Sequence, residues 1–156
     1  MSTPGDMRIV EYEPVHQASF KRLNEEWITR WFTLEKADHQ ALDHPEEYIL
    51  TPGGHILMAL LDAEAVGTCA LLRRDNDSFE LAKMSVAEHA RGRGLGLLLG
   101  RAAIDRARQL GARRLFLESN TRLEPAINLY RKLGFREIKE AASPYARCNI
   151  QMELIL

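Results

Sequence analysis

A glycine-rich segment between a predicted strand and a predicted helix limits the possible folds of this chain more than any other part of the sequence. The segment is Arg91-Gly92-Arg93-Gly94-Leu95-Gly96. Residues 79–86 before it alternate between two faces as a strand does, and residues 95–110 repeat apolar positions every three or four residues as a helix does. A second strand is predicted at 114–118. This order of strand, helix and strand predicts a parallel pair joined by a right-handed crossover.

The remaining apolar patterns predict an antiparallel sheet around that unit. In chain order we expect a strand at 7–12, a helix near 20–31, a helical loop at 33–50, a hairpin of strands at 55–61 and 65–72, a helix at 125–133, and strands at 135–139 and 146–156. In the first helix Phe20, Leu23, Trp27, Ile28 and Trp31 form the apolar face, and the opposite face carries Lys21, Arg22, Asn24, Glu25 and Glu26. The fold class is therefore α/β (α+β), with a mixed sheet of six to seven strands, mostly antiparallel around a central parallel pair, and about four helices.

Composition excludes several classes of protein. With 156 residues, 46% of them hydrophobic and 28% charged, the chain is expected to form a single domain over 1–156. A formal net charge of −1 argues against nucleic acid as a partner. No apolar run reaches the roughly 18 residues of a membrane span, and the N-terminus lacks the pattern of a signal peptide, so we expect no membrane partner and a cytoplasmic location. Cys69 and Cys148 lack metal-ligand spacing, so no metal site is predicted.

The glycine-rich segment has the chemistry of an anion-binding loop. Glycines let backbone N–H groups converge on an anion without interference from a Cβ, and a helix N-terminus adds partial positive charge. Arg91 and Arg93 would strengthen the attraction. Two nucleotide-binding patterns fail on spacing, because GxGxxG requires glycine where Leu97 stands and a P-loop requires Gly-Lys before Ser or Thr. From the loop alone, a phosphate site and a plain strand-to-helix connection both remain open.

Two blocks of the sequence resemble the GNAT superfamily of N-acetyltransferases. Arg91–Gly96 matches its [Gln/Arg]-x-x-Gly-x-[Gly/Ala] signature, and Leu117–Asn120 followed by Ala126–Phe135 resembles its second block, a strand followed by a helix that ends in Gly-Phe. The resemblance implies that the fourth and fifth strands splay apart, that the pantetheine arm of acetyl-CoA lies between them, and that the pyrophosphate meets the loop amides. The residues implied to bind acetyl-CoA are Met84, Ser85, Val86, Arg91, Gly92, Arg93, Gly94, Leu95, Gly96, Leu97, Asn120 and Asn128.

The resemblance implies transfer of an acetyl group from acetyl-CoA, as acyl-donor cosubstrate, to a primary amine of a small molecule or peptide by direct attack in a ternary complex. The amine must first lose a proton, and Glu80 is the candidate general base, with an exposed strand-end carboxylate as the alternative. A backbone N–H near Met84–Val86 is expected to stabilise the oxyanion. Tyr130 matches the tyrosine that protonates the leaving thiolate, with simple packing on its helix as the alternative. A route through an acyl-cysteine is a minor alternative.

Several questions stay open at the level of the sequence. A coenzyme A binding module that senses acyl-CoA without turnover is the alternative function. The acceptor amine is not identified, and its specificity is expected to lie in 20–54 and 141–147. Trp27, Trp31 and Phe32 are interpreted as core residues more readily than as a wall of the acceptor site. The resemblance also suggests a homodimer formed through the last strand.

Overall fold

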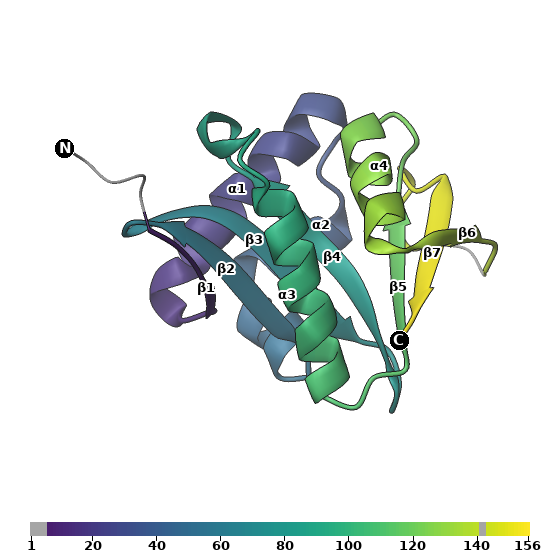
Figure 1. Cartoon of the computed structure of the whole chain (residues 1–156). Helices are drawn as coiled ribbons and strands as arrows, with labels where there is room; N and C mark the ends of the chain where they lie inside the picture. The colour runs from purple at the N-terminus through teal and green to yellow at the C-terminus, as the bar shows by residue number, and fades with distance from the viewer. Residues whose placement is uncertain (1–5, 141–142) are drawn as a thin grey trace.

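The computed structural model describes residues 6–140 and 143–156, so the domain predicted over 1–156 and the acceptor segment predicted at 141–147 extend beyond the described residues (Figure 1). The strands are β1 (Met7–Glu11), β2 (His55–Leu61), β3 (Glu64–Arg73), β4 (Ser78–Val86), β5 (Arg114–Ser119), β6 (Arg136–Ile138) and β7 (Ile150–Ile155). The α-helices are α1 (Gln17–Trp31), α2 (Lys36–Asp43), α3 (Leu95–Gln109) and α4 (Glu124–Leu133). Short 3₁₀ helices lie at Pro14–His16 and Glu88–Ala90, and a π-helical turn lies at Glu46–Leu50.

All seven strands belong to one mixed sheet, in the order β1-β2-β3-β4-β5-β7-β6. Neighbouring strands are antiparallel except β4 and β5, which are parallel and are connected through α3. The predicted mixed sheet with a central parallel pair is therefore confirmed. Because β7 lies between β5 and β6, its position does not support dimerisation by pairing of the last strand, and a homodimer stays a prediction.

Helices cover both faces of the sheet, with α3 and α4 on the face toward the viewer in Figure 1 and α1 and α2 behind it. The alternation of strand side chains produces this arrangement. In β2, Leu57 and Ala59 contribute to the core beneath α3, whereas Ile56 and Met58 contribute to the core beneath α1 and α2. Among the described helices, none combines the length and apolar character that crossing a bilayer requires.

Two predictions about the elements need correction. Asn24, predicted on the solvent face of α1, is fully buried, because its Nδ2 donates hydrogen bonds to the Phe20 carbonyl at 2.9 Å and to Thr68 Oγ1 at 3.1 Å. The strand predicted at 146–156 begins only at Ile150. The backbone before it is held by side chains of another element, since the Ala146 N–H donates to a Glu35 carboxylate oxygen at 3.0 Å. Both corrections concern contacts between residues distant in sequence.

Candidate active site

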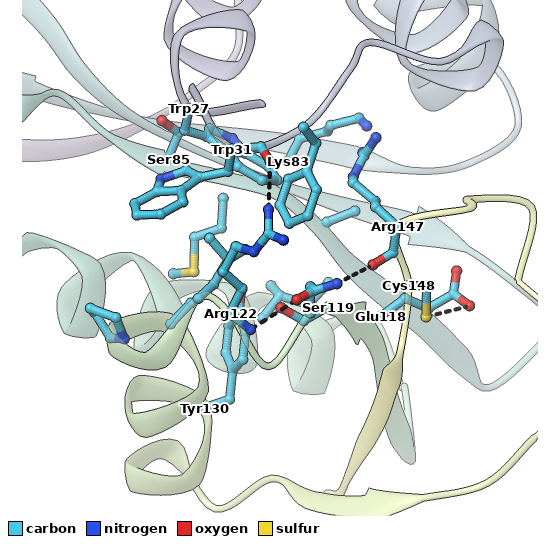
Figure 2. A pocket seen from close by; sticks show the side chains of 18 of the residues that line it. Trp27, Trp31, Lys83, Ser85, Glu118, Ser119, Arg122, Tyr130, Arg147 and Cys148 are labelled. Carbon is cyan, nitrogen blue, oxygen red and sulfur yellow. Dashed lines mark hydrogen bonds between the residues drawn. The ribbon is translucent and has the colours of Figure 1, made fainter. Parts of the chain in front are cut away.

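Strands β4 and β5 separate soon after they pair. Their parallel register covers only 78–80 opposite 114–116, although β4 continues to Val86 and β5 to Ser119. A cavity of about 490 Å³ opens between the diverging strands and is bordered by α1, α4 and the segment before β7 (Figure 2). Its volume is within the usual range for sites that bind small molecules.

A β-bulge lies in β4 three to four residues beyond its last pairing with β5. One residue of β3, Cys69, faces two residues of β4, Lys83 and Met84. Lys83 has a φ of 50°, which lies in the left-handed region that residues with a Cβ seldom adopt. Such a conformation costs about 1–3 kcal/mol and persists only where surrounding contacts enforce it. Those contacts come from two polar networks, one at the backbone of Lys83 and one at its side chain.

The first network holds the carbonyl of the bulge. The Thr68 hydroxyl donates to the Lys83 carbonyl at 2.7 Å and accepts a hydrogen bond from Asn24 Nδ2 at 3.1 Å. Trp27 Nε1 in turn donates to Asn24 Oδ1 at 3.2 Å. Because Asn24, Thr68 and Lys83 are buried, these bonds remove the cost of leaving polar atoms unpaired in apolar surroundings. The network fixes α1 against the bulge.

The second network holds the ammonium group of Lys83. Its Nζ lies 2.7 Å from Asp38 Oδ1, on α2, and 3.2 Å from the Tyr145 hydroxyl. Arg147 donates two hydrogen bonds to the same carboxylate, at 2.6 and 2.7 Å, and lies 3.4 Å from Glu35 Oε2. The side chains of Lys83 and Asp38 are 4% and 0% exposed. Two cations therefore face two carboxylates in this cluster, which links α2, β4 and the segment before β7.

The pKa of Asp38 is lowered from 3.8 to about 2. Burial by itself would raise this pKa, but the hydrogen bond from Arg147 and the charge and hydrogen bond of Lys83 outweigh burial. The carboxylate therefore stays ionised at neutral pH. Its removal would leave two positively charged side chains in the protein interior without their main partner.

We expect Asp38→Ala to lower the free energy of unfolding by about 3–5 kcal/mol, because breaking a buried ion pair leaves an uncompensated buried charge. Urea denaturation at pH 7 measures the change. The matched control is Asp43→Asn on the same helix, which removes an exposed ion pair with Lys21 at 2.7 Å and is expected to change stability little. Equal losses in the two variants would contradict the role given to Asp38.

The contribution of Asp38 to stability is also expected to depend on pH. Its folded pKa of about 2 lies below its ordinary value of 3.8, so the unfolded chain binds the proton more tightly. The contribution is therefore fully present above the ordinary pKa and is lost as the pH falls toward 2. Unfolding curves recorded at several pH values between about 4 and 2 should show the difference in stability between wild type and Asp38→Ala becoming smaller as the pH falls. A difference that stays constant would contradict the lowered pKa of Asp38.

Two carboxylates lie where the strands separate. Glu80 occupies the last paired position of β4, Glu118 lies on β5, and both side chains line the cavity. The pKa of Glu80 is raised from 4.5 to about 7, chiefly by burial and then by the charge of Glu118, with Arg74 and Lys83 opposing the shift. Glu118 accepts a hydrogen bond from Gln151 Nε2 at 3.0 Å. A half-buried carboxylate with a pKa near neutrality can accept a proton and release it again, as a general base must.

Tyr130 reaches the same cavity from α4 (Figure 2). Its ring also packs edge-on against Phe135, with 6.0 Å between the ring centroids. Burial, and then the neighbouring Cys69, raise its pKa above the ordinary value of 10, so the phenol keeps its proton at neutral pH. Burial likewise raises the pKa of Cys69 to about 12, which keeps that thiol protonated and unsuited to a nucleophilic role.

The glycine-rich segment leads directly into α3 at one end of the cavity. Gly92 and Gly94 have φ values of 80° and 76°, in the region that favours glycine. Apart from the glycine itself and its two chain neighbours, no described atom lies within 4 Å of the position that a Cβ would take at either residue, so an approaching ligand would meet backbone. The first N–H groups of a helix have no partner within it. Arg91 lines the cavity and donates from Nε to the Val86 carbonyl at 3.2 Å.

Only some of the residues predicted to bind acetyl-CoA line the cavity. Those that line the cavity are Met84, Ser85, Val86, Arg91 and Asn120. The hydroxyl of Ser85 is occupied, because it donates to the Leu23 carbonyl at 2.9 Å. Asn120 donates to the Arg147 carbonyl at 2.7 Å and accepts from the Arg122 N–H at 2.8 Å, so its side chain shapes the wall.

The remaining predicted residues lie outside the described wall of the cavity. The residues concerned are Gly92, Arg93, Gly94, Leu95, Gly96 and Leu97 of the loop and helix start, and Asn128 of α4. The side chain of Leu95 is buried in the core, which leaves only its backbone available to a ligand. Asn128 is exposed on α4. For the loop residues, any contact with an anion would be made by backbone N–H groups or by the exposed Arg93.

Several residues of the site were not predicted. The cluster of Asp38, Lys83, Tyr145 and Arg147 joins segments that no local pattern connects, and isolated charges in a sequence usually indicate a solvated surface. Of the aromatic residues interpreted as core, Trp27 and Phe32 do pack against the core beneath α1 and α2, whereas Trp31 is 44% exposed, and all three also line the cavity. The available signal was the clustering of three aromatic residues at the end of one predicted helix.

Comparison with known proteins gives matches over most of the chain. The acetyltransferase (GNAT) family model matches residues 18–135. The uncharacterized N-acetyltransferase YjgM of Escherichia coli (strain K12) is 32% identical over 116 residues, which cover 71% of this chain and 70% of that protein. The N-acetylaspartate synthetase of Danio rerio is 34% identical over 109 residues, which cover 69% of this chain but only 39% of that protein.

Solved structures have the same fold. A GNAT-family acetyltransferase from Staphylococcus aureus Mu50 has a TM-score of 0.86 at 22% identity, with 95% of this chain and 98% of that chain covered. The protein yncA from Salmonella typhimurium, solved with its cofactor acetyl-CoA, has a TM-score of 0.72 at 17% identity, with 96% and 94% covered. At these identities the likeness establishes the fold alone, and it agrees with the fold class predicted from the sequence.

Proposed function

Because the chain belongs to the acetyltransferase (GNAT) family, we propose that it transfers an acetyl group from acetyl-CoA to a primary amine by direct attack in a ternary complex. The observation that carries the proposal is the opening between β4 and β5, which brings Glu80 and Tyr130 into one cavity beside the glycine-rich start of α3. The test is release of free thiol from acetyl-CoA in the presence of candidate amines.

The cavity and its glycine-rich end fit the two chemically different parts of acetyl-CoA. The open backbone at Gly92 and Gly94, the first N–H groups of α3 and the Arg91 side chain suit a pyrophosphate. Beyond Glu80, none of the described strands pairs with β4 on its β5 side, so its backbone can bond the amides of a pantetheine arm as it would a neighbouring strand. When bound, acetyl-CoA supplies a thioester that an amine can attack.

Glu80 is the proposed general base. An alkyl amine is mostly protonated at neutral pH and must lose its proton before it can attack. With a pKa of about 7, Glu80 is ionised in a large fraction of molecules at neutral pH and can accept that proton directly or through water. Glu118 supports this step, because a second carboxylate in the cavity attracts a cationic amine and raises the pKa of Glu80.

Tyr130 is the proposed donor to the leaving sulfur. The amine freed by Glu80 adds to the thioester carbon, which forms the C–N bond and an oxyanion, and the C–S bond breaks as the oxyanion collapses. The second amine proton passes to the departing sulfur, directly or through Tyr130, so that coenzyme A leaves as the thiol, and the proton on Glu80 is released to solvent. Because its pKa is raised, the Tyr130 phenol carries its proton when negative charge develops on the sulfur and can donate a hydrogen bond to the sulfur. Backbone N–H groups near Met84–Val86 remain the proposed donors to the oxyanion.

Glu80→Gln is expected to lower kcat/KM by about 10²–10⁴-fold, the usual contribution of general acid–base catalysis. In wild type, kcat/KM should rise with pH through about 7 as Glu80 loses its proton, and this step should disappear in the variant. Initial rates of thiol release between pH 5.5 and 9 measure both effects. A variant with wild-type rate and pH profile would remove Glu80 from the mechanism.

The same variant provides its own control for folding. Because the folded pKa of Glu80 lies above its ordinary value, ionisation destabilises the folded state as the pH rises from 4.5 through 7. Glu80→Gln removes this cost and should raise the free energy of unfolding above pH 7 by about 3 kcal/mol. Denaturation at pH 8 measures the change. Loss of both activity and stability would show that the substitution damages the fold.

Tyr130→Phe is expected to lower kcat by roughly 100-fold while the Kd for acetyl-CoA changes less than about twofold, because the substitution removes only the hydroxyl. Calorimetric titration and thiol release measure the two quantities separately. Unchanged turnover would leave Tyr130 with a packing role against Phe135 only. A wild-type protein that binds acetyl-CoA but acetylates no amine would favour the alternative of a non-catalytic sensor.

A further inference from the structure

Arg122 lies across the mouth of the cavity. It follows β5, and its Nη1 donates a hydrogen bond at 3.1 Å to the carbonyl of Trp31, at the end of α1 (Figure 2). Its guanidinium lies 5.5 Å from the centroid of the Phe32 ring. One side chain thus connects the wall formed by α1 with the wall formed after β5. Among the described residues, its polar and ring contacts are therefore a neutral carbonyl and an aromatic ring.

The other cations that line the cavity are already engaged. Lys83 and Arg147 are paired with Asp38, and Arg147 also with Glu35. Arg91 lies at the glycine-rich end and donates to a backbone carbonyl. Within residues 6–140 and 143–156, no carboxylate forms an ion pair with Arg122. The mouth therefore presents a positive charge that the described part of the protein does not neutralise.

We propose that Arg122 binds the carboxylate of the acceptor, and that the acceptor is a small molecule carrying both an amine and a carboxylate, of the class of free amino acids. A guanidinium has five N–H donors in a planar fork, and only one is used by the Trp31 carbonyl. The remaining donors can form the paired hydrogen bonds that carboxylates accept from arginine. This inference rests on the proposed function, because it assigns the acceptor of the same site.

The charges of the cavity then orient such an acceptor. Glu80 and Glu118 lie on the two strands and suit the ammonium group, whereas Arg122 offers a positive charge to the carboxylate. Glu124 at the start of α4 also lines the cavity, but none of the ion pairs among the described residues joins it to Arg122. Arg122 itself is exposed, with the Phe32 ring beside its guanidinium, so a carboxylate can reach its remaining N–H donors from solvent. An amine without a carboxylate would lose this contact but keep the contact with Glu80.

The test compares standard L-amino acids with their carboxamides, which keep the amine and replace the carboxylate by a neutral group. Wild type should acetylate or bind some free amino acids better than the matched carboxamides. Arg122→Gln should lower the ratio of kcat/KM for acid over amide roughly 10- to 100-fold, by raising the KM for the acid. Arg122→Lys keeps the positive charge but lacks the planar fork of donors, and it should therefore retain part of the preference for the free acid. The matched control is Arg30→Gln. The Arg30 guanidinium lies 5.8 Å from the centroid of the Trp31 ring, but it pairs with Glu88 and does not line the cavity, so its loss should leave the preference unchanged.

Binding is measured separately from turnover, so that the two proposals can fail independently. Both tryptophans of the chain, Trp27 and Trp31, line the cavity, and intrinsic fluorescence titration in the presence of coenzyme A reports its occupancy. If wild type binds free amino acids and Arg122→Gln abolishes that binding, the inference is supported. If at the same time no amine is acetylated, the proposed function fails while the inference stands. The inference is overturned if Arg122→Gln leaves the preference for acids over amides unchanged. It is also overturned if neither amino acids nor their carboxamides bind, whether or not other amines are acetylated.

Discussion

The bulge at Lys83 is the constraint on which the site depends. It places a residue with a Cβ in the left-handed region, and the strain is compensated by one network at the Lys83 carbonyl and another at its ammonium group. Six polar or charged residues are buried in the described part of the chain. All except Ser78 lie in or beside these networks, namely Asn24, Asp38, Thr68, Lys83 and Ser85. Polar groups are costly to bury, so their concentration at the divergence of β4 and β5 indicates that the opening itself is what the fold maintains.

The same opening explains the chemistry assigned to its carboxylate. At the last paired position before the strands part, Glu80 is removed from bulk water but still faces the cavity, and this intermediate position raises its pKa to near neutrality. A fully paired strand would bury the residue, and an exposed strand end would leave its pKa near the ordinary value. Ionisation of Glu80 therefore costs stability, and we interpret this cost as the consequence of holding a base in a dry site.

The sequence was sufficient for properties that depend on local patterns. Strand alternation, helical spacing and the glycine-rich segment predicted the mixed sheet, the parallel pair and the start of α3. They did not predict the bulge, because the partner of Lys83 is Asp38, 45 positions away, or the pairing of Asp38 with Arg147, 109 positions away. The contact between Arg122 and Trp31 was not predicted for the same reason, since these residues are 91 positions apart and meet only in the folded chain.

The central claim is that the space between β4 and β5 binds acetyl-CoA, and thermal unfolding with and without this ligand tests it most directly. A ligand that binds only the folded state at 100 times its Kd stabilises it by about 2.7 kcal/mol, which corresponds to a rise in Tm of about 5–11 °C for a chain of this length. Such a rise is expected for protein purified free of coenzyme A. An unchanged Tm at saturating acetyl-CoA, in protein shown to be folded, would contradict it.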